Sequence, residues 1–180
     1  MRTRLRAEAG IGLVELLIAM TVLAVALLAL VAAFSSGALT LQRAGQTSTA
    51  SALANQQMEL YRGLKYCAIR LDDSASNLPG PTPYTSDAAY SASQVLDTAV
   101  CGGSAQPCAA GPPPECDASR NVPASESPDR RNYRVDTYIV YVNTPPAREH
   151  KQVTVVVRDA DNLTTTGLVR TSSKFDQISG

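Results

Sequence analysis

The stretch IGLVELLIAMTVLAVALLALVAAF, from Ile11 to Phe34, is an apolar block interrupted only by Gly12, Glu15 and Thr21. A helix over these 24 residues is about 36 Å long, which is enough to cross the roughly 30 Å hydrocarbon core of a bilayer. The apolar region of a cleaved secretory signal is shorter, at about 7 to 15 residues. The block therefore predicts a membrane-spanning helix.

Glu15 is the one charged residue inside this block. A carboxylate costs about 2.5 to 3.5 kcal/mol at the centre of a bilayer and less near its edge, so an acidic residue inside an apolar span is a functional candidate. We expect Glu15 to need a cationic partner, because an ammonium and a carboxylate buried together avoid much of the penalty that each would carry alone.

The charges around the block predict its orientation. Arg2, Arg4 and Arg6 precede it, and the next charge after Glu15 is Arg43. The positive-inside bias then keeps the N-terminus in the cytoplasm and places the rest of the chain outside. Over the 180 residues, 16 Lys and Arg balance 16 Asp and Glu and no basic face appears, so no nucleic acid is predicted as a partner of the head that follows the block.

The residues around the start of the block resemble a known motif. A short basic leader ends in Gly10, the stretch Ile11-Gly-Leu-Val-Glu15 follows, and the run from Leu16 to Phe34 is apolar almost throughout. This pattern resembles the type IV prepilin signature, which type IV pilins share with the pseudopilins of type II secretion systems. Two positions depart from it: Ile11 stands where Phe or Met is commoner, and Gly12 stands where Thr or Ser is usual.

The resemblance implies that a prepilin peptidase cleaves after Gly10 and that the new amine of Ile11 is N-methylated. It also implies that Glu15, the fifth residue of the mature chain, pairs with an Ile11 amine in the assembled filament. Residues 1–10 would then be a leader peptide and residues 11–34 the transmembrane or filament-core helix. We expect Gly12 to lower the efficiency of cleavage without preventing it.

Residues 35–71 contain no proline and predict a continuing amphipathic helix. The residues expected on its packing face are Ala50, Leu53, Gln57, Leu60 and Leu64, and those expected to point elsewhere are Gln56, Glu59 and Arg62. Glycine costs about 1 kcal/mol relative to Ala inside a helix, so a kink or melted turn is expected at Gly37, Gly45 or Gly63. The stretch from Ala50 to Gly63 is also similar to the corresponding helix of minor pilins of the pilus-modification kind.

Residues 72–132 hold nine of the eleven prolines and three of the four cysteines, and they predict a long irregular loop. Because the chain beyond the block is exported, we expect its cysteines to form disulfides; the candidates are Cys67, Cys101, Cys108 and Cys116. Four cysteines allow three pairings, and spacing alone does not choose among them. No metal site is predicted, because no C-x-x-C spacing occurs and the chain has a single histidine.

Residues 133–180 predict the antiparallel β-sheet of the head. Tyr133–Val142 and Val153–Arg158 alternate in polarity, and a third strand is expected over Leu168–Ser172. The apolar side chains expected to share a face within their strands are Tyr133, Val135, Ile139 and Tyr141 in the first, and Val153, Val155 and Val157 in the second. The sequence thus predicts an α+β fold, with a long N-terminal helix packed on a small antiparallel sheet. The pilin fold that the resemblance implies has the same arrangement.

No catalytic constellation is visible in the sequence. His150, in the charged segment Arg148-Glu149-His150-Lys151, is predicted to be a solvated loop histidine rather than a general base. Asp159, Asp161 and Asn162 fit a turn better than a calcium loop, because the twelve-residue calcium pattern is missing. We therefore expect a structural or assembly protein without a cofactor, and not an enzyme.

The leading interpretation is a minor type IV pilin, which is a structural subunit of a pilus-like filament after cleavage and N-methylation. Its expected partners are other pilin subunits in a helical filament, the prepilin peptidase and methyltransferase, the pilus assembly platform and the cytoplasmic membrane. The precursor is expected in the cytoplasmic membrane as a single-pass protein, and the mature protein in an extracellular pilus or cell-envelope filament.

Two alternatives stay open. A pseudopilin of a type II secretion or DNA-uptake system shares the same signature. A single-pass anchored surface protein would instead use the loop of residues 72–132 to contact a host or a surface, and it would keep residues 1–10.

Overall fold

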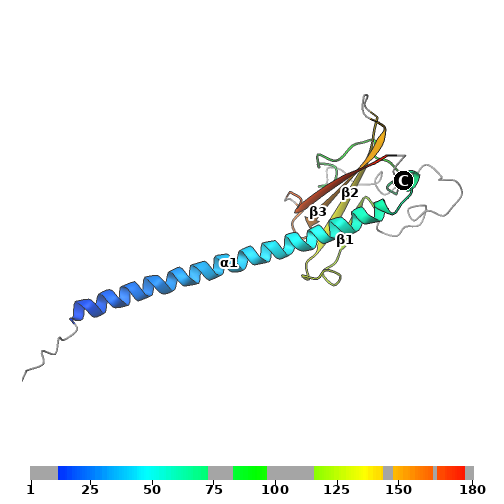
Figure 1. Ribbon diagram of the computed structural model, residues 1–180. Coiled ribbons are helices and arrows are strands. Elements are labelled where there is room, and N and C mark those ends of the chain that lie inside the picture. Colours follow the sequence, from blue (N-terminus) through cyan, green and yellow to red (C-terminus); the bar gives the residue numbers. More distant parts are fainter. Residues whose placement is uncertain (1–11, 73–82, 97–115, 144–147, 164–165, 177–180) are drawn as a thin grey trace, which may run out of the picture. The chain divides into compact units, whose positions relative to one another are not determined.

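The computed structural model describes residues 12–72, 83–96, 116–143, 148–163 and 166–176. The chain divides into two compact units, Met1–Ala44 and Gly45–Gly180. Its elements are the helix α1 (Leu13–Arg62), the short 3-10 helix η1 (Tyr66–Ala68), and the strands β1 (Ser119–Val122), β2 (Tyr133–Val142), β3 (His150–Asp159) and β4 (Val169–Asp176) (Figure 1). The coarse prediction of an α+β layout, with one long apolar N-terminal helix and an antiparallel sheet, is confirmed.

Helix α1 is continuous where a melted turn was expected. Gly37 and Gly45 both lie inside it, so their helix propensity does not break it. The helix ends at Arg62 rather than near Leu71, because the Gly63 amide donates to the carbonyls of Glu59 and Leu60 and the chain then leaves the helical path. The last turn is tightened there, because the Leu64 amide also donates to the carbonyl three residues back, that of Tyr61, at 3.3 Å.

The sheet is a four-stranded antiparallel meander with the order β1-β2-β3-β4. Strand β2 has the predicted bounds, whereas β3 begins at His150 instead of Val153 and β4 extends to Asp176. Strand β1 was not predicted, because it lies within the expected loop of residues 72–132. It is four residues long and mostly polar, and it shows no alternation of apolar and polar residues. Its strand conformation comes from its pairing with β2.

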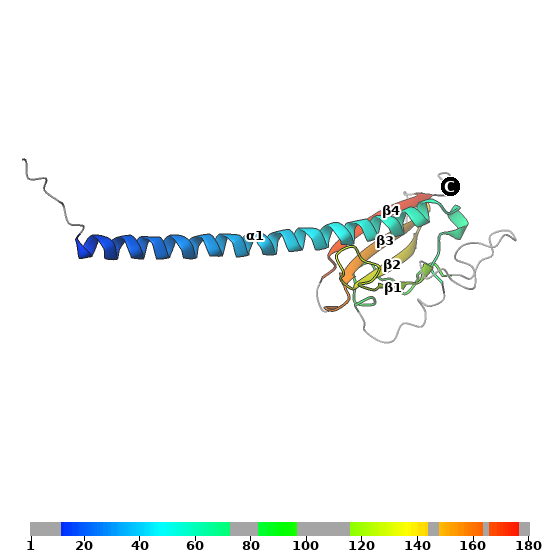
Figure 2. The same ribbon diagram turned by 90° about the horizontal axis from the view of Figure 1, so that it is seen from below.

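One face of the sheet packs on the second half of α1 and forms the core of the head (Figure 2). The buried helix residues are Ala50, Ala54, Gln57, Met58 and Tyr61. They cluster with the inner side chains of β2 and β3, which include Val135, Ile139, Val153, Val155 and Val157. Of the predicted packing face, Leu53, Leu60 and Leu64 are partly buried against this core, and Gln56, Glu59 and Arg62 are exposed as expected.

The opposite face of the sheet is covered by residues 83–96, which the sequence placed in a structureless loop. The Tyr84 ring stacks on the Tyr138 ring with 4.4 Å between the centroids. The Tyr84 hydroxyl donates to the Thr137 carbonyl at 2.8 Å, and the Tyr138 hydroxyl donates to the Tyr84 carbonyl at 3.1 Å. The head therefore has three layers, and the residues on both faces of β2 and β3 are buried. Tyr141, predicted on the inner face, lies near the end of β2 and is 44% exposed.

Candidate functional site

The first candidate is the apolar part of α1. Every described residue from Gly12 to Gly45 is exposed, and among the large apolar side chains Leu13 is 81%, Phe34 78% and Leu41 75% exposed. This helix is long and apolar enough to cross a membrane, and none of its most apolar window is buried in the chain itself. A continuous apolar surface of this size marks a contact with lipid or with other protein chains.

Glu15 lies in the first turn of α1, where its backbone amide donates to the Gly12 carbonyl at 2.8 Å. Its side chain is exposed, and among the described residues no cation pairs with it. A carboxylate at a helix N-terminus is favoured by the helix dipole, but this does not neutralise its charge. Gly10 and Ile11, the predicted cleavage and methylation positions, lie outside the described residues.

Two hydroxyl groups in the apolar part of α1 are satisfied within the helix. The Thr21 hydroxyl donates to the Ile18 carbonyl at 2.8 Å, and the Ser35 hydroxyl donates to the Val31 carbonyl at 2.9 Å. In a hydrocarbon environment an unpaired hydroxyl is costly, so these internal bonds make both residues compatible with lipid or a dry helix interface. Glu15 is then the one polar side chain of this block that lacks a partner among the described residues.

Cys67 and Cys116 both take part in disulfide bonds, as expected for an exported head. Cys67 is exposed within η1, and Cys116 is fully buried just before β1. The other two candidates, Cys101 and Cys108, lie outside the described residues. These bonds restrain the chain at the end of the helical region and at the entrance to the sheet.

The predicted loop around His150 is instead the start of β3. His150 is half-buried, and its Nδ1 atom lies 2.8 Å from the Arg148 carbonyl. Lys151, which was expected in the same charged turn, is buried, and its ammonium donates to the carbonyls of Tyr66 and Ile69 at 2.9 Å each. Burial, with a smaller contribution from Arg70, lowers the pKa of Lys151. The prediction failed because Lys151 lies on the same inward face of β3 as Val153, Val155 and Val157. The neighbouring charged residues made this segment look like an exposed turn in the sequence.

The acidic segment after β3 forms a hydrogen-bonded turn. The Asp161 amide donates to the Asp159 carboxylate at 3.0 Å, and Gln46 donates to the same carboxylate at 3.0 Å. The Asn132 side chain donates to Asp161 at 3.1 Å. These oxygens thus close a turn and tie it to α1 and to the start of β2. Within the described ranges, no group of three or more His, Cys, Asp and Glu side chains could hold a metal ion.

A second candidate, which the sequence did not reveal, is a charged cluster between the sheet and residues 83–96. Asp136 is fully buried, and its carboxylate accepts from Arg134 and Arg158 at 2.8 Å each. Arg158 also pairs with Asp87, which accepts two further bonds from Arg170 at 2.6 and 2.7 Å. Burial alone would raise the pKa of Asp87, but hydrogen bonds from Arg170, the Ala89 amide and Arg158 together hold it below its usual value.

This cluster stabilises the packing of residues 83–96 on the sheet, because Asp87 forms ion pairs with Arg158 in β3 and with Arg170 in β4. All five charged members are engaged with one another, so the cluster offers no unpaired group for catalysis. Comparison of the chain with models of known protein families, with curated proteins and with solved structures finds no match. The geometry that remains distinctive is the exposed apolar segment of α1 with Glu15 in its first turn.

Proposed function

We propose that this protein is a minor subunit of a type IV pilus-like filament, with a pilin-type head and a structural rather than catalytic role. The observation that carries the proposal is the exposed apolar surface from Leu13 to Phe34 with its single acidic residue, Glu15, at the start of the helix. The precursor would hold this segment in the cytoplasmic membrane, and the mature subunit would bury it against other subunits.

Glu15 supplies the specificity of this assembly. A carboxylate moved from the edge of a bilayer into a dry helix bundle is strongly disfavoured unless a cation accompanies it. Cleavage after Gly10 would create such a cation, the amine of Ile11, on every subunit. Pairing of Glu15 with the Ile11 amine of a neighbouring subunit would neutralise both charges and set the axial register between the two helices.

The head supports the proposal because its core is built from residues that follow the apolar segment. The first buried residue among those described is Ala50, so the surface before it is available for contacts outside the head. The disulfide-bonded cysteines suit a domain that faces the cell exterior.

The first experiment is the N-terminal mass of the mature protein, recovered from membranes and from sheared filaments. We expect a peptide that begins with N-methylated Ile11, and we expect the Gly10→Val variant to retain Met1. Retention of Met1 in the unchanged protein would contradict prepilin processing and favour the anchored surface protein.

The second experiment compares Glu15→Val with Glu59→Val, which removes an exposed carboxylate from the head part of α1. Both variants should insert into the membrane, since neither adds a charge to the apolar segment. Glu15→Val should be depleted from filaments at least about tenfold, whereas Glu59→Val should assemble normally. Normal incorporation of Glu15→Val would show that the carboxylate does not pair in the filament.

A further inference from the structure

The two edges of the sheet differ in the backbone hydrogen bonds that other described segments make to them. Strand β1 pairs with the first part of β2, and residues 94 and 95 pair with the part of β2 that follows. The Val95 amide donates to the Ile139 carbonyl at 2.8 Å, and Gln94 forms an antiparallel β-bridge with Val140. Strand β4, at the other edge, has β3 as its one partner in the described part of the sheet. Among the residues that the structure describes, none makes a backbone hydrogen bond to the outer side of β4 between Val169 and Phe175. An open edge of this kind is a template for another strand.

The side chains of β4 restrict which strand could add to this edge. Arg170 and Lys174 lie on the same face of the strand and are exposed, and Arg170 keeps 46% of its side chain exposed although it pairs with Asp87. A second copy of β4 would bring like charges together, which disfavours pairing of the edge with itself. Acidic side chains on an added strand would instead meet the Lys174 ammonium and the exposed part of the Arg170 side chain.

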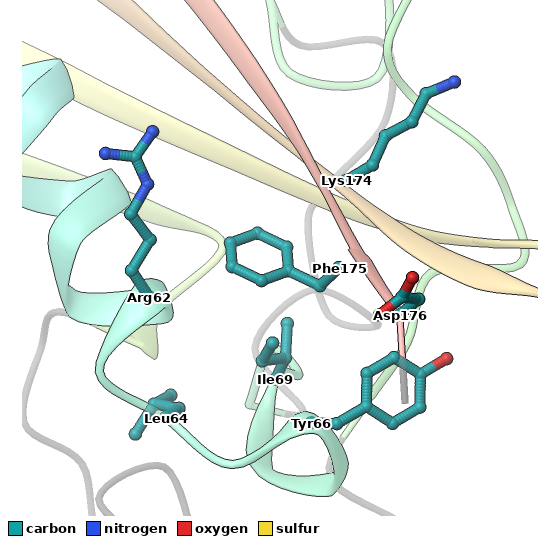
Figure 3. Close-up of a pocket in the computed structure, with 7 residues that line it drawn as sticks. All are labelled: Arg62, Leu64, Tyr66, Ile69, Lys174, Phe175 and Asp176. Atoms are coloured by element: carbon teal, nitrogen blue, oxygen red, sulfur yellow. The ribbon is translucent and has the colours of Figure 1, made fainter. Parts of the chain in front are cut away.

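The C-terminal end of β4 borders a pocket of about 220 Å³ at the end of α1 (Figure 3), and Phe175 contributes to it from the face of β4 opposite Arg170. Its lining residues are Arg62, Leu64, Tyr66, Ile69, Lys174, Phe175 and Asp176. Figure 3 shows the Phe175 ring and the Lys174 side chain leaving β4 in opposite directions, as alternation along a strand requires. The apolar part of the pocket, formed mainly by Leu64, Ile69 and Phe175, is large enough for one bulky apolar side chain.

We propose that the outer edge of β4 binds an extended segment of a partner protein in which apolar and acidic side chains alternate. Backbone hydrogen bonds to β4 hold the segment, an apolar side chain enters the pocket beside Phe175, and acidic side chains on the other face contact Arg170 and Lys174. This mode of recognition takes its affinity from the main chain and its specificity from alternate side chains. It does not depend on filament assembly, since every residue involved belongs to the head.

The test uses the full chain in detergent micelles and a fluorescent, end-capped peptide, Thr-Glu-Phe-Glu-Val-Glu-Thr, with binding followed by anisotropy. We expect saturable binding that Lys174→Glu weakens about tenfold, because one attraction becomes a repulsion. The control is Arg130→Glu, which makes the same charge change at an exposed residue in the loop before β2. Replacement of the peptide's Phe by Ser should also weaken binding. Absence of saturable binding, or equal loss with Arg130→Glu, would overturn the proposal.

A second pair of peptides tests the backbone contact. One carries N-methyl groups on the first, third, fifth and seventh amides, and the other on the second, fourth and sixth. Because a strand presents alternate amides to its neighbour, only one of the two peptides should lose binding to β4. Equal behaviour of the two would exclude strand addition. A dimer of the chain whose formation prevents binding of the unmethylated peptide would place a second copy on the edge and would equally overturn the proposal.

Discussion

The Nε atom of Arg158 lies 2.8 Å from the Oδ2 atom of Asp136, and both side chains are buried between the sheet and residues 83–96. The Nη2 atom of the same Arg158 guanidinium pairs with Asp87, so one side chain connects the sheet to the segment that covers it. Removing one member of a buried ion pair leaves the other charge without compensation, which is why such pairs are sensitive to single substitutions.

Arg158→Met should therefore lower the free energy of unfolding of the head by about 3 to 5 kcal/mol. Urea unfolding of the detergent-solubilised chain, followed by circular dichroism, measures this loss. Arg62→Met is the control, because Arg62 pairs with Glu59 on the exposed face of α1 and should cost no more than about 0.5 kcal/mol. Similar losses of unfolding free energy in the two variants would mean that the buried cluster does not stabilise the packing of residues 83–96 on the sheet.

Asp87 should make the head sensitive to acid. Its folded-state pKa lies below that of an ordinary aspartate, so its contribution to stability is complete above about pH 4 and is lost as the pH falls through the lower folded value. Asp87→Asn should lower stability at neutral pH and flatten this acid dependence. Unfolding midpoints measured between about pH 6 and pH 2 give the comparison, and an unchanged slope would contradict the assignment.

Lys151→Met should destabilise the head by about 1 to 3 kcal/mol, because the carbonyls of Tyr66 and Ile69 lose their common donor in a buried position. Lys174→Met, at an exposed lysine on β4, should change stability by less than about 0.5 kcal/mol. Thermal unfolding of both variants checks the difference. A neutral Lys151→Met would show that water satisfies the two carbonyls.

Replacing two of the glycines by alanine should change the stability of the protein in opposite directions. A Cβ at Gly45 meets nothing within 4 Å, so Gly45→Ala should stabilise the helix by about 1 kcal/mol. A Cβ at Gly167 would lie 2.5 Å from Cγ1 of Val156, so Gly167→Ala should cost about 1 to 3 kcal/mol through displacement of β3 or β4. The melting temperatures of the two variants should move apart, and a shift of the same sign would be inconsistent with these contacts.

The elements that were predicted correctly are those with a strong local pattern. The apolar block predicts the first part of α1, the spacing of Ala50 and Gln57 predicts the face that packs on the sheet, and the alternation from Tyr133 to Val142 predicts β2. The helix end was misplaced because no proline marks it and Gly63 looked like a weak point inside a longer helix. The start of β3 was missed because charged residues hid an inward-facing position at Lys151.

The residues between the helix and β2 carry no such pattern. Prolines and small polar residues predict a loop there, yet Tyr84 and Asp87 dock on the sheet and Ser119–Val122 pairs with β2 as β1. Of the candidate site, Glu15 could be predicted from its position in the apolar block. The cluster around Asp136 could not, since its members are separated by up to 83 residues between Asp87 and Arg170.

Hydrophobic periodicity is a local property of the chain, so the apolar helix, its single carboxylate at Glu15 and the inner face of the central strand follow from the sequence alone. Three further features depend on tertiary packing: Asp136 and Arg158 are buried as partners, residues 83–96 cover the second face of the sheet, and no other described strand pairs with the outer edge of β4. These features depend on which distant segments meet. A buried charge is tolerated, or a sheet edge closed, only where another part of the chain supplies the matching group.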